Sequence, residues 1–206
     1  MSTQILLIRH GQTEWNQVER FRGRAEIDLD EIGKNQAEAT ATRLSGSGLS
    51  ALYCSPLKRA VKTAQAIRNL TGVTADVLPD LTDVDYGRWQ GLTLEEAQNR
   101  DPDVFAHWRH SPQLVRFPQG ESMEEVRSRA AGVVETLKLK HQAQTFAIVS
   151  HVVVCRLLVL HLLGIETSHF WNTAHDNCGI TTFMMKGDLP VATGINDTCH
   201  LHRQGS

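Results

Sequence analysis

Two histidines follow short apolar runs that lie far apart in the chain. Residues 5–8 lead to His10, and residues 146–149 lead to His151. An apolar run of this length that ends in polar residues is typical of a strand buried on both faces. Ligand-binding groups in open α/β sheets gather just past the carboxyl ends of such strands. The sequence therefore predicts a site with two imidazoles at one edge of a sheet.

Arginines accompany these histidines. Arg9 directly precedes His10, Arg59 lies at the start of a predicted helix, and Arg22 lies in a long polar segment over residues 11–31. Several cations close to a helix N-terminus form a binding site for a compact dianion such as phosphate. Arginine binds phosphoryl oxygens in pairs and can neutralise developing charge without a metal. We therefore expect a phosphate site with no metal ion and no other cofactor.

The elements that must position these residues alternate between strands and helices. Ser55 and Pro56 should open one helix as its N-cap and its first residue, and Ser122 begins a capping box. Such alternation predicts an α/β fold with three layers, α/β/α. Besides the two strands above, we expect strands at 51–54, 75–78, 180–185 and 191–195, and helices at 33–44, 55–70, 93–100, 102–108, 122–141 and 152–163.

The composition limits the classes of protein to which the chain can belong. With 206 residues, of which 41% are hydrophobic, the chain should form a single domain over residues 1–206. A net charge of −2 makes nucleic acid and anionic membranes poor candidates as partners. No apolar run reaches the length of a membrane span and no signal peptide is recognisable, so we expect a cytoplasmic protein. The four cysteines are widely spaced, which favours reduced thiols.

A series of ordered motifs resembles the histidine phosphatase superfamily, also called the phosphoglycerate mutase-like family. The series covers most of the chain and is far more specific than any single motif. The resemblance implies a mostly parallel central sheet of the phosphoglycerate mutase-like type. The motifs are Arg9-His10-Gly11 with Asn16, Gly33-x-x-Gln36-Ala37, Ser55-Pro56-Leu57-x-Arg59-Ala60-x-x-Thr63-Ala64, Leu81-x-Asp83-x-Asp85-Tyr86-Gly87-x-Trp89-x-Gly91, Gly120-Glu121-Ser122 and Val149-Ser150-His151.

The resemblance also implies catalytic roles. His10 would attack phosphorus and form a phosphohistidine, while its other ring nitrogen donates to a backbone carbonyl. An acid must protonate the leaving alkoxide and then deprotonate the attacking water. Asp83 stands at the matching position, where many relatives have the longer glutamate, and Asp85 is the alternative acid. His151, protonated beside the phosphate, would supply a further positive donor.

Binding roles follow from the same resemblance. Arg9, Asn16 and Arg59 would hold the non-bridging phosphate oxygens. Around the substrate we expect Arg22 and Gly23, where glutamine-glycine is frequent in the family, and Val152, where glycine is usual. Arg22 and His200 are candidate partners for a substrate carboxylate. A small phosphorylated metabolite is thus the expected partner, and a homodimer stays open because relatives are often dimers.

Three hypotheses about function remain. The first is a metal-independent phosphomonoesterase, similar to the metal-independent phosphoserine phosphatases, with α-ribazole phosphate, sugar phosphates and broad specificity as open alternatives to phosphoserine or another phospho-acid. The second is a cofactor-dependent phosphoglycerate mutase. Mutases of the family are longer and carry arginine and histidine after the acid, where this chain has Val84 and Asp85. The third is a binding protein without activity, which the complete set of phosphate contacts disfavours. We therefore favour the phosphatase.

Overall fold

The computed structural model describes residues 2–201, and within them the strands form one six-stranded sheet in the order β3-β2-β4-β1-β5-β6. The first four strands along the chain are parallel to one another, β5 runs antiparallel to β1, and β6 runs antiparallel to β5. This arrangement confirms the mostly parallel sheet. The strands are β1 (Gln4–Arg9), β2 (Leu49–Cys54), β3 (Ala75–Val77), β4 (Thr145–Ser150), β5 (Ile180–Lys186) and β6 (Leu189–Asp197).

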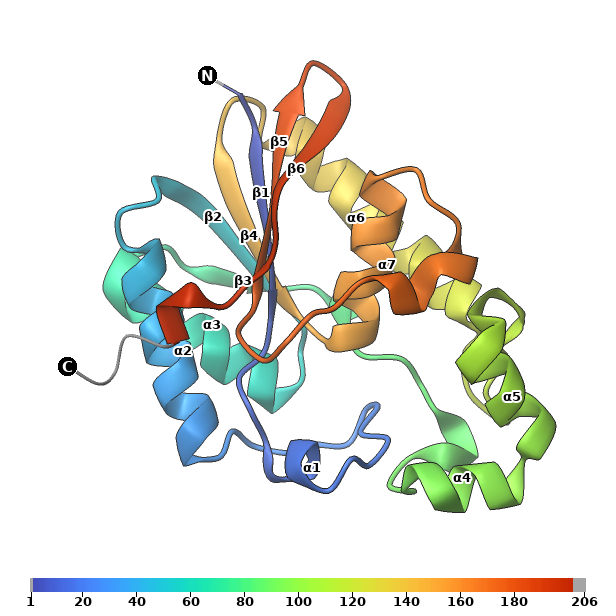
Figure 1. Ribbon diagram of the computed structural model, residues 1–206. Coiled ribbons are helices and arrows are strands. Elements are labelled where there is room, and N and C mark those ends of the chain that lie inside the picture. Colours follow the sequence, from blue (N-terminus) through green and yellow to red (C-terminus); the bar gives the residue numbers. More distant parts are fainter. Residues whose placement is uncertain (1, 202–206) are drawn as a thin grey trace.

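Helices cover both faces of the sheet, as Figure 1 shows. On one face lie α2 (Glu31–Leu44) and α3 (Lys58–Thr71), and on the other lie α6 (Met123–Lys140) and α7 (Val152–Leu162). Side chains alternate along β1, so Leu6 packs into the core beside α2 and α3 and Leu7 into the core beside α6 and α7. The predicted three-layer α/β/α fold is confirmed.

A smaller lobe stands beside the sheet next to the loop that follows β1 (Figure 1). It contains α4 (Leu94–Arg100) and α5 (Pro102–His110), and the loop itself contains the short helix α1 (Glu14–Gln17). Phe21 joins the loop to the lobe, because its ring centroid lies 5.1 Å from that of Trp89 and 5.2 Å from that of Trp108. The remaining short 3-10 helices are Pro79–Leu81, Gly87–Trp89, Pro112–Leu114, Thr167–Asn172 and Cys199–Leu201.

The predicted start of one helix is confirmed and that of another is wrong. The Ser122 hydroxyl accepts a hydrogen bond from the backbone N–H of Glu125, which completes the capping box at α6. Gly72 ends α3 in the left-handed conformation, with φ 74°. However, α3 begins at Lys58 with Leu57 as N-cap. Ser55 is not the N-cap because its hydroxyl turns instead toward the imidazole of His151.

The helix α7 is apolar and mostly buried, with one exception. Arg156 is the single Lys, Arg, Asp or Glu between Val152 and Leu162. No helix within residues 2–201, α7 included, is both long and apolar enough to cross a membrane.

Candidate active site

The two predicted imidazoles meet at the carboxyl ends of adjacent strands. Arg9 of β1 pairs with Ser150 of β4, so His10 and His151 leave the sheet side by side. Their ring centroids lie 5.2 Å apart, and both side chains are buried. The connections that follow these two central strands run to opposite faces of the sheet. Ligands of open α/β sheets bind at such a point, outside the carboxyl ends of the two strands.

The ring of His10 is fixed at both nitrogens. Its Nδ1 lies 2.6 Å from the carbonyl oxygen of Gly11, and its Nε2 lies 3.2 Å from the Nε of Arg59, which donates to it. With Nδ1 as the donor, Nε2 keeps its lone pair, which is the tautomer that a nucleophile needs. Burial, and after it the charges of Arg59 and Arg9, hold the pKa of His10 well below the usual histidine value. The buried ring is therefore neutral.

Gly11 allows this arrangement because the chain comes very close to α2 there. A Cβ on Gly11 would lie 2.4 Å from the carbonyl oxygen of Gly33 in the first turn of α2. The backbone N–H of Gly11 also donates to the hydroxyl of Thr63 in α3, at 3.1 Å. These contacts hold the carbonyl that orients His10.

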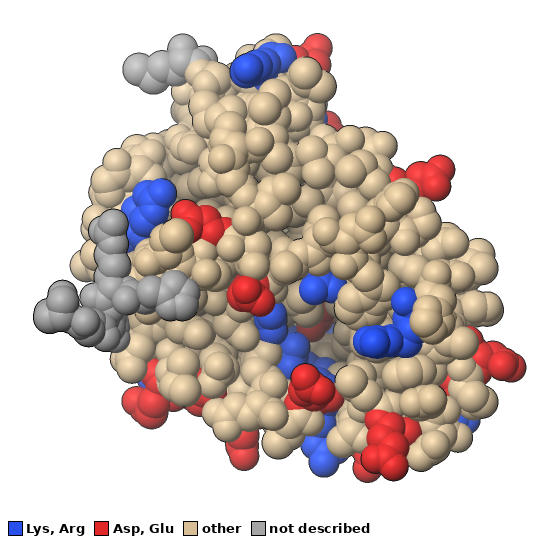
Figure 2. All heavy atoms as spheres, viewed as in Figure 1, with Lys and Arg blue, Asp and Glu red and all other residues tan. Residues whose placement is uncertain are grey.

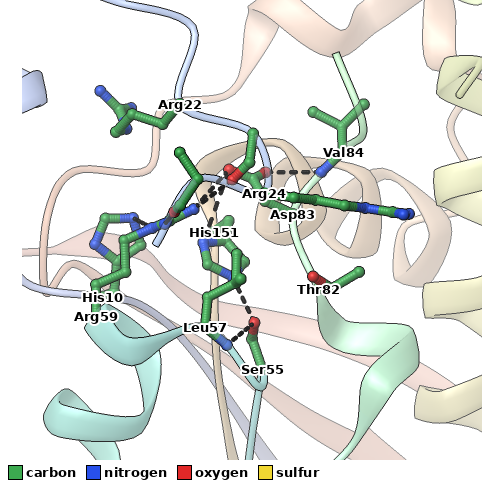
Figure 3. Close-up of polar contacts among 12 residues, drawn as sticks. His10, Arg22, Arg24, Ser55, Leu57, Arg59, Thr82, Asp83, Val84 and His151 are labelled. Carbon is green, nitrogen blue, oxygen red and sulfur yellow. Dashed lines mark hydrogen bonds and ion pairs between the residues drawn. The ribbon is translucent and has the colours of Figure 1, made fainter. Parts of the chain in front are cut away.

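Arg59 connects the site to the loop after β1. Its guanidinium donates to the carbonyl oxygens of Ala25 at 2.8 Å and Gly23 at 2.7 Å, and to the Oδ2 of Asp83 at 3.3 Å. The side chain is fully buried in the first turns of α3. Gly23, predicted to bind substrate, thus lies in the site as a support for Arg59. Figure 3 shows Arg59 between His10 and Asp83.

Asp83 lies in the site and Asp85 lies outside it. Asp83 is 3% exposed, and its Oδ2 lies 3.8 Å from the Nδ1 of His151. Burial raises the pKa of Asp83, although the charges of Arg59 and Arg22 act against that rise. In contrast, the Asp85 carboxylate accepts from the backbone of Gly87 and pairs with Arg24.

His151 is held through one ring nitrogen. Its Nε2 lies 2.6 Å from the hydroxyl oxygen of Ser55, and its Nδ1 has no hydrogen-bond partner within residues 2–201. Burial and the Arg59 charge keep the pKa of His151 well below the usual value, so the ring is neutral in the free protein. The predicted protonated His151 concerns the phosphate-bound state, in which a dianion would raise this pKa.

A cleft of about 330 Å³ opens next to these residues, and Asp83 lines it, whereas His10, Arg59 and His151 are not among its lining residues. Five residues predicted from the sequence line it: Arg9, Asn16, Arg22, Asp83 and Val152. Its volume is at the lower end of the range usual for small-molecule sites. Figure 2 shows lysine and arginine atoms within a hollow on this side of the molecule.

Two of these cations still have free donors. Arg9 donates to the carbonyl oxygen of His175 at 2.8 Å, and Arg22 to that of Trp15 at 3.1 Å. Within the part of the chain that the structure describes, the buried Nε of each has no partner. Asn16 uses its carbonyl oxygen to accept from Thr13, which leaves its amide N–H groups for a ligand.

His200 does not belong to this cleft, which corrects the prediction that it binds substrate. It follows the edge strand β6, and its Nε2 lies 3.1 Å from the hydroxyl oxygen of Thr40 in α2. The chain turns onto α2 after β6, so His200 faces a separate depression together with Arg43 and Asp197.

Sequence reasoning missed two further features of the site. Arg156 lines the cleft from α7, one helical turn beyond Val152. Arg129 of α6 holds the loop of Asp83 by donating to the carbonyl oxygens of Thr82 at 2.7 Å and Asp83 at 3.1 Å. A lone arginine in an apolar helix was the available signal for Arg156; the contacts of Arg129 leave no local pattern.

Comparisons with known proteins agree with this geometry. The family model of the histidine phosphatase superfamily (branch 1) matches residues 5–198. Phosphoserine phosphatase 1 of Hydrogenobacter thermophilus is 36% identical over 197 residues, which cover 96% of this chain and 93% of that protein. The metal-independent phosphoserine phosphatase of Arabidopsis thaliana is 35% identical over 164 residues, or 78% of this chain and 68% of that protein.

A solved structure resembles the whole fold. A histidine-to-alanine variant of phosphoserine phosphatase from Entamoeba histolytica, in complex with phosphoserine, has a TM-score of 0.87 and 30% identity. The match covers 97% of this chain and 99% of that chain. The chain belongs to the histidine phosphatase superfamily. The family and the relatives together identify it as a phosphoric monoester hydrolase, which confirms the predicted class of enzyme.

Proposed function

We propose that the protein is a metal-independent phosphoserine phosphatase that works through a phosphohistidine at His10. The observation that carries the proposal is the state of His10 Nε2. This nitrogen belongs to a neutral, buried ring and accepts from Arg59 at 3.2 Å, and the ring centroid of His10 lies 5.2 Å from that of His151. A fixed lone pair next to cations is what in-line attack on a phosphoryl group needs.

In the first step, the hydrogen bond from Arg59 to His10 Nε2 breaks, Nε2 forms a bond to phosphorus, and the bond from phosphorus to the ester oxygen breaks. Asp83, whose pKa is raised by burial, donates its proton to the leaving alkoxide. In the second step, water attacks phosphorus and Asp83 takes a proton from it. The bond from nitrogen to phosphorus breaks, inorganic phosphate leaves, and the lone pair returns to His10.

The cations stabilise the charge that builds up on the phosphoryl oxygens. We assign this role to Arg9 and Arg59, with the amide of Asn16 as a neutral donor. His151 adds a positive donor once the phosphate dianion has raised its pKa. Its Nδ1 has no other partner within residues 2–201, so it can serve this purpose.

Phosphoserine is the substrate that the relatives support best. Two relatives that are 35–36% identical are phosphoserine phosphatases, and the Entamoeba histolytica enzyme binds phosphoserine within the same fold. The cleft of about 330 Å³ suits a small metabolite. We also propose that residues 1–206 act as one domain in the cytoplasm. Cell fractionation tests the location, and light scattering tests the homodimer that the sequence left open.

The decisive experiment measures phosphate release from phosphoserine in the presence of a chelator. We expect full activity without added metal, loss of activity in His10→Ala, and an acid-labile phosphoenzyme on His10 in the wild-type protein. A strict requirement for magnesium would contradict the mechanism. Rapid isomerisation of 3-phosphoglycerate with a bisphosphate primer, without phosphate release, would instead identify a mutase.

A further inference from the structure

Arg156 is a half-buried cation that lines the cleft and has free donors. Its guanidinium carbon lies 5.2 Å from the ring centroids of both Phe170 and Trp171. Within residues 2–201 it forms no ion pair, and its buried Nε has no hydrogen-bond partner. Aromatic faces can fix a guanidinium without using its N–H groups. Arg156 is therefore held in place while its donors stay free.

A half-buried cation whose buried Nε has no hydrogen-bond partner within residues 2–201 calls for an explanation. An arginine that loses water without gaining a partner destabilises a protein, and burial lowers the pKa of Arg156 for the same reason. Arg59, by comparison, donates hydrogen bonds from its guanidinium to Ala25, Gly23 and Asp83. A buried polar group without a partner is characteristic of a site that a ligand completes.

Trp108, which also lines the cleft, carries a second donor without a partner among residues 2–201. The indole Nε1 of Trp108 is buried and has no partner within the described part of the chain. The indole of Trp171, in contrast, donates to the carbonyl oxygen of Trp108 at 2.7 Å. Two unused donors on the wall of one cleft thus point to an acceptor-rich group of the ligand.

The position of Arg156 relates this acceptor to the phosphate. His151 is the N-cap of α7, and Arg156 follows it by five positions, so the helix rise separates them by roughly 7–8 Å along the axis. A phosphate beside His151 and a second anion beside Arg156 would then lie a few covalent bonds apart. One free guanidinium fork matches the two oxygens of a carboxylate.

We propose that Arg156 is the specificity-determining residue that binds the carboxylate of the phosphorylated substrate, with Trp108 as an additional donor. The proposal rests on the phosphatase function given above and replaces His200, which lies outside the cleft. It defines the substrate class as compact phospho-acids with the carboxylate two or three carbon atoms from the phosphate ester.

Phosphoserine and phosphoethanolamine form a matched pair of substrates, because they differ only in the carboxylate. Arg156→Gln should lower kcat/KM for phosphoserine by about 10- to 100-fold and change that for phosphoethanolamine by less than about 3-fold, since only one substrate loses a charge-assisted contact. Arg156→Lys, which keeps the charge but not the fork, should lie between wild type and Arg156→Gln. Equal losses with both substrates, or no loss with phosphoserine, would overturn the proposal.

The control is Arg109→Gln. Arg109 is exposed on α5, and its guanidinium carbon lies 5.7 Å from the Trp171 ring centroid without lining the cleft. This change should leave both substrates unaffected. The control therefore shows whether the effect of Arg156→Gln comes from removing a cation near the Trp171 ring or from removing a contact to the carboxylate.

A binding measurement keeps this inference separate from the catalytic proposal. In His10→Ala, calorimetry should show phosphoserine binding at least about 10-fold more tightly than phosphoethanolamine, and His10→Ala with Arg156→Gln should abolish the preference. Equal affinities, or no binding of phosphoserine, would overturn the carboxylate site. Failure of the wild-type protein to hydrolyse phosphoserine would contradict the proposed function alone, because this preference does not depend on turnover.

Discussion

Arg59 donates a hydrogen bond from its Nε to the Nε2 of His10 over 3.2 Å. The nitrogen that we expect to attack phosphorus is thus oriented by a cation before any substrate binds. The same guanidinium contacts Asp83 at 3.3 Å, so one side chain links the nucleophile to the acid. The hydrogen bond to Nε2 occupies the lone pair that attacks phosphorus, so Arg59 must release Nε2 when substrate binds and can then donate the freed N–H to a phosphoryl oxygen.

Substitution of Arg59 tests this link. Arg59→Lys keeps the positive charge but cannot reach His10, Asp83 and the loop carbonyls together, so kcat/KM should fall by about 100- to 1000-fold. Steady-state kinetics with phosphoserine measure the loss. The control is Arg68→Lys, at an exposed position of the same helix, which should change little. Activity within about 3-fold of wild type in Arg59→Lys would contradict the role.

Asp83→Asn should affect substrates according to their leaving group. An amide cannot donate the proton that an alkoxide needs, so hydrolysis of phosphoserine should slow by about 100- to 10,000-fold. With p-nitrophenyl phosphate, whose leaving group needs no proton, the loss should be much smaller. Asp85→Asn is the matched control, because its carboxylate pairs with Arg24 outside the cleft. If Asp85→Asn gave the leaving-group dependence instead, the alternative acid would be the correct one.

The position of the loop that carries Asp83 should depend on the ion pair between Arg129 and Glu121. Arg129 pairs with Glu121 at 2.9 Å, and Glu121 also accepts from the backbone N–H of Asp85 at 2.9 Å. Arg129→Leu would leave the loop carbonyls without this donor and the Glu121 carboxylate with only the Asp85 N–H and Arg24 as partners. The kcat should therefore fall, and the free energy of unfolding should drop by about 1–3 kcal/mol. Urea denaturation and kinetics check both effects.

The control for Arg129→Leu is an exposed ion pair between Glu125 of the same helix and Arg116, which precedes that helix. Arg116 pairs with Glu125 near the start of α6, and both side chains are at least half exposed. Arg116→Leu should cost less than about 1 kcal/mol and leave kcat unchanged, since solvent screens such pairs. Equal effects of the two substitutions would show that the Arg129 pair has no special part in holding the loop.

The sequence was sufficient for the fold because its core strands are short, apolar and bounded by polar residues. The same regularity placed His10 and His151 together, since both end parallel strands. The error at Ser55 has a physical cause: a serine before proline is a common N-cap, but here the hydroxyl bonds to His151, 96 positions away. Local patterns carry no information about a contact of that kind.

The sequence also failed to predict which side chains from distant segments reach the cleft. His200 was expected there as a candidate partner for a substrate carboxylate, but it follows the edge strand β6 and contacts α2 instead. Arg156 was overlooked inside a helix that the apolar pattern predicted as core. Whether a residue of this kind faces core or cleft depends on the packing of Phe170 and Trp171, which lie in a separate segment.

The last prediction concerns His175, a buried histidine behind Arg9. Neither ring nitrogen has a partner within residues 2–201, and burial, with the charges of Arg9 and Arg156 opposing the weaker influence of Asp176, lowers the pKa of His175 to about 3. The unfolded chain binds a proton near pH 6.5, whereas the folded protein excludes it down to about pH 3. This group therefore stabilises the fold above pH 6.5, and its contribution is lost as the pH falls toward 3.

His175→Phe should remove the one proton that His175 binds in the unfolded chain but not in the folded protein. Urea denaturation between about pH 6 and pH 4 should show that the free energy of unfolding falls with acidification less steeply in the variant, by about 1.4 kcal/mol per pH unit. The slope is compared rather than the absolute stability, so any cost of the larger ring cancels. His110→Phe, at an exposed position on α5, should keep the wild-type slope. His10 and His151, whose pKa values are lowered in the same direction, would maintain a residual slope in both variants. An unchanged slope in His175→Phe would show that His175 takes up its proton in the folded state as readily as in the unfolded chain.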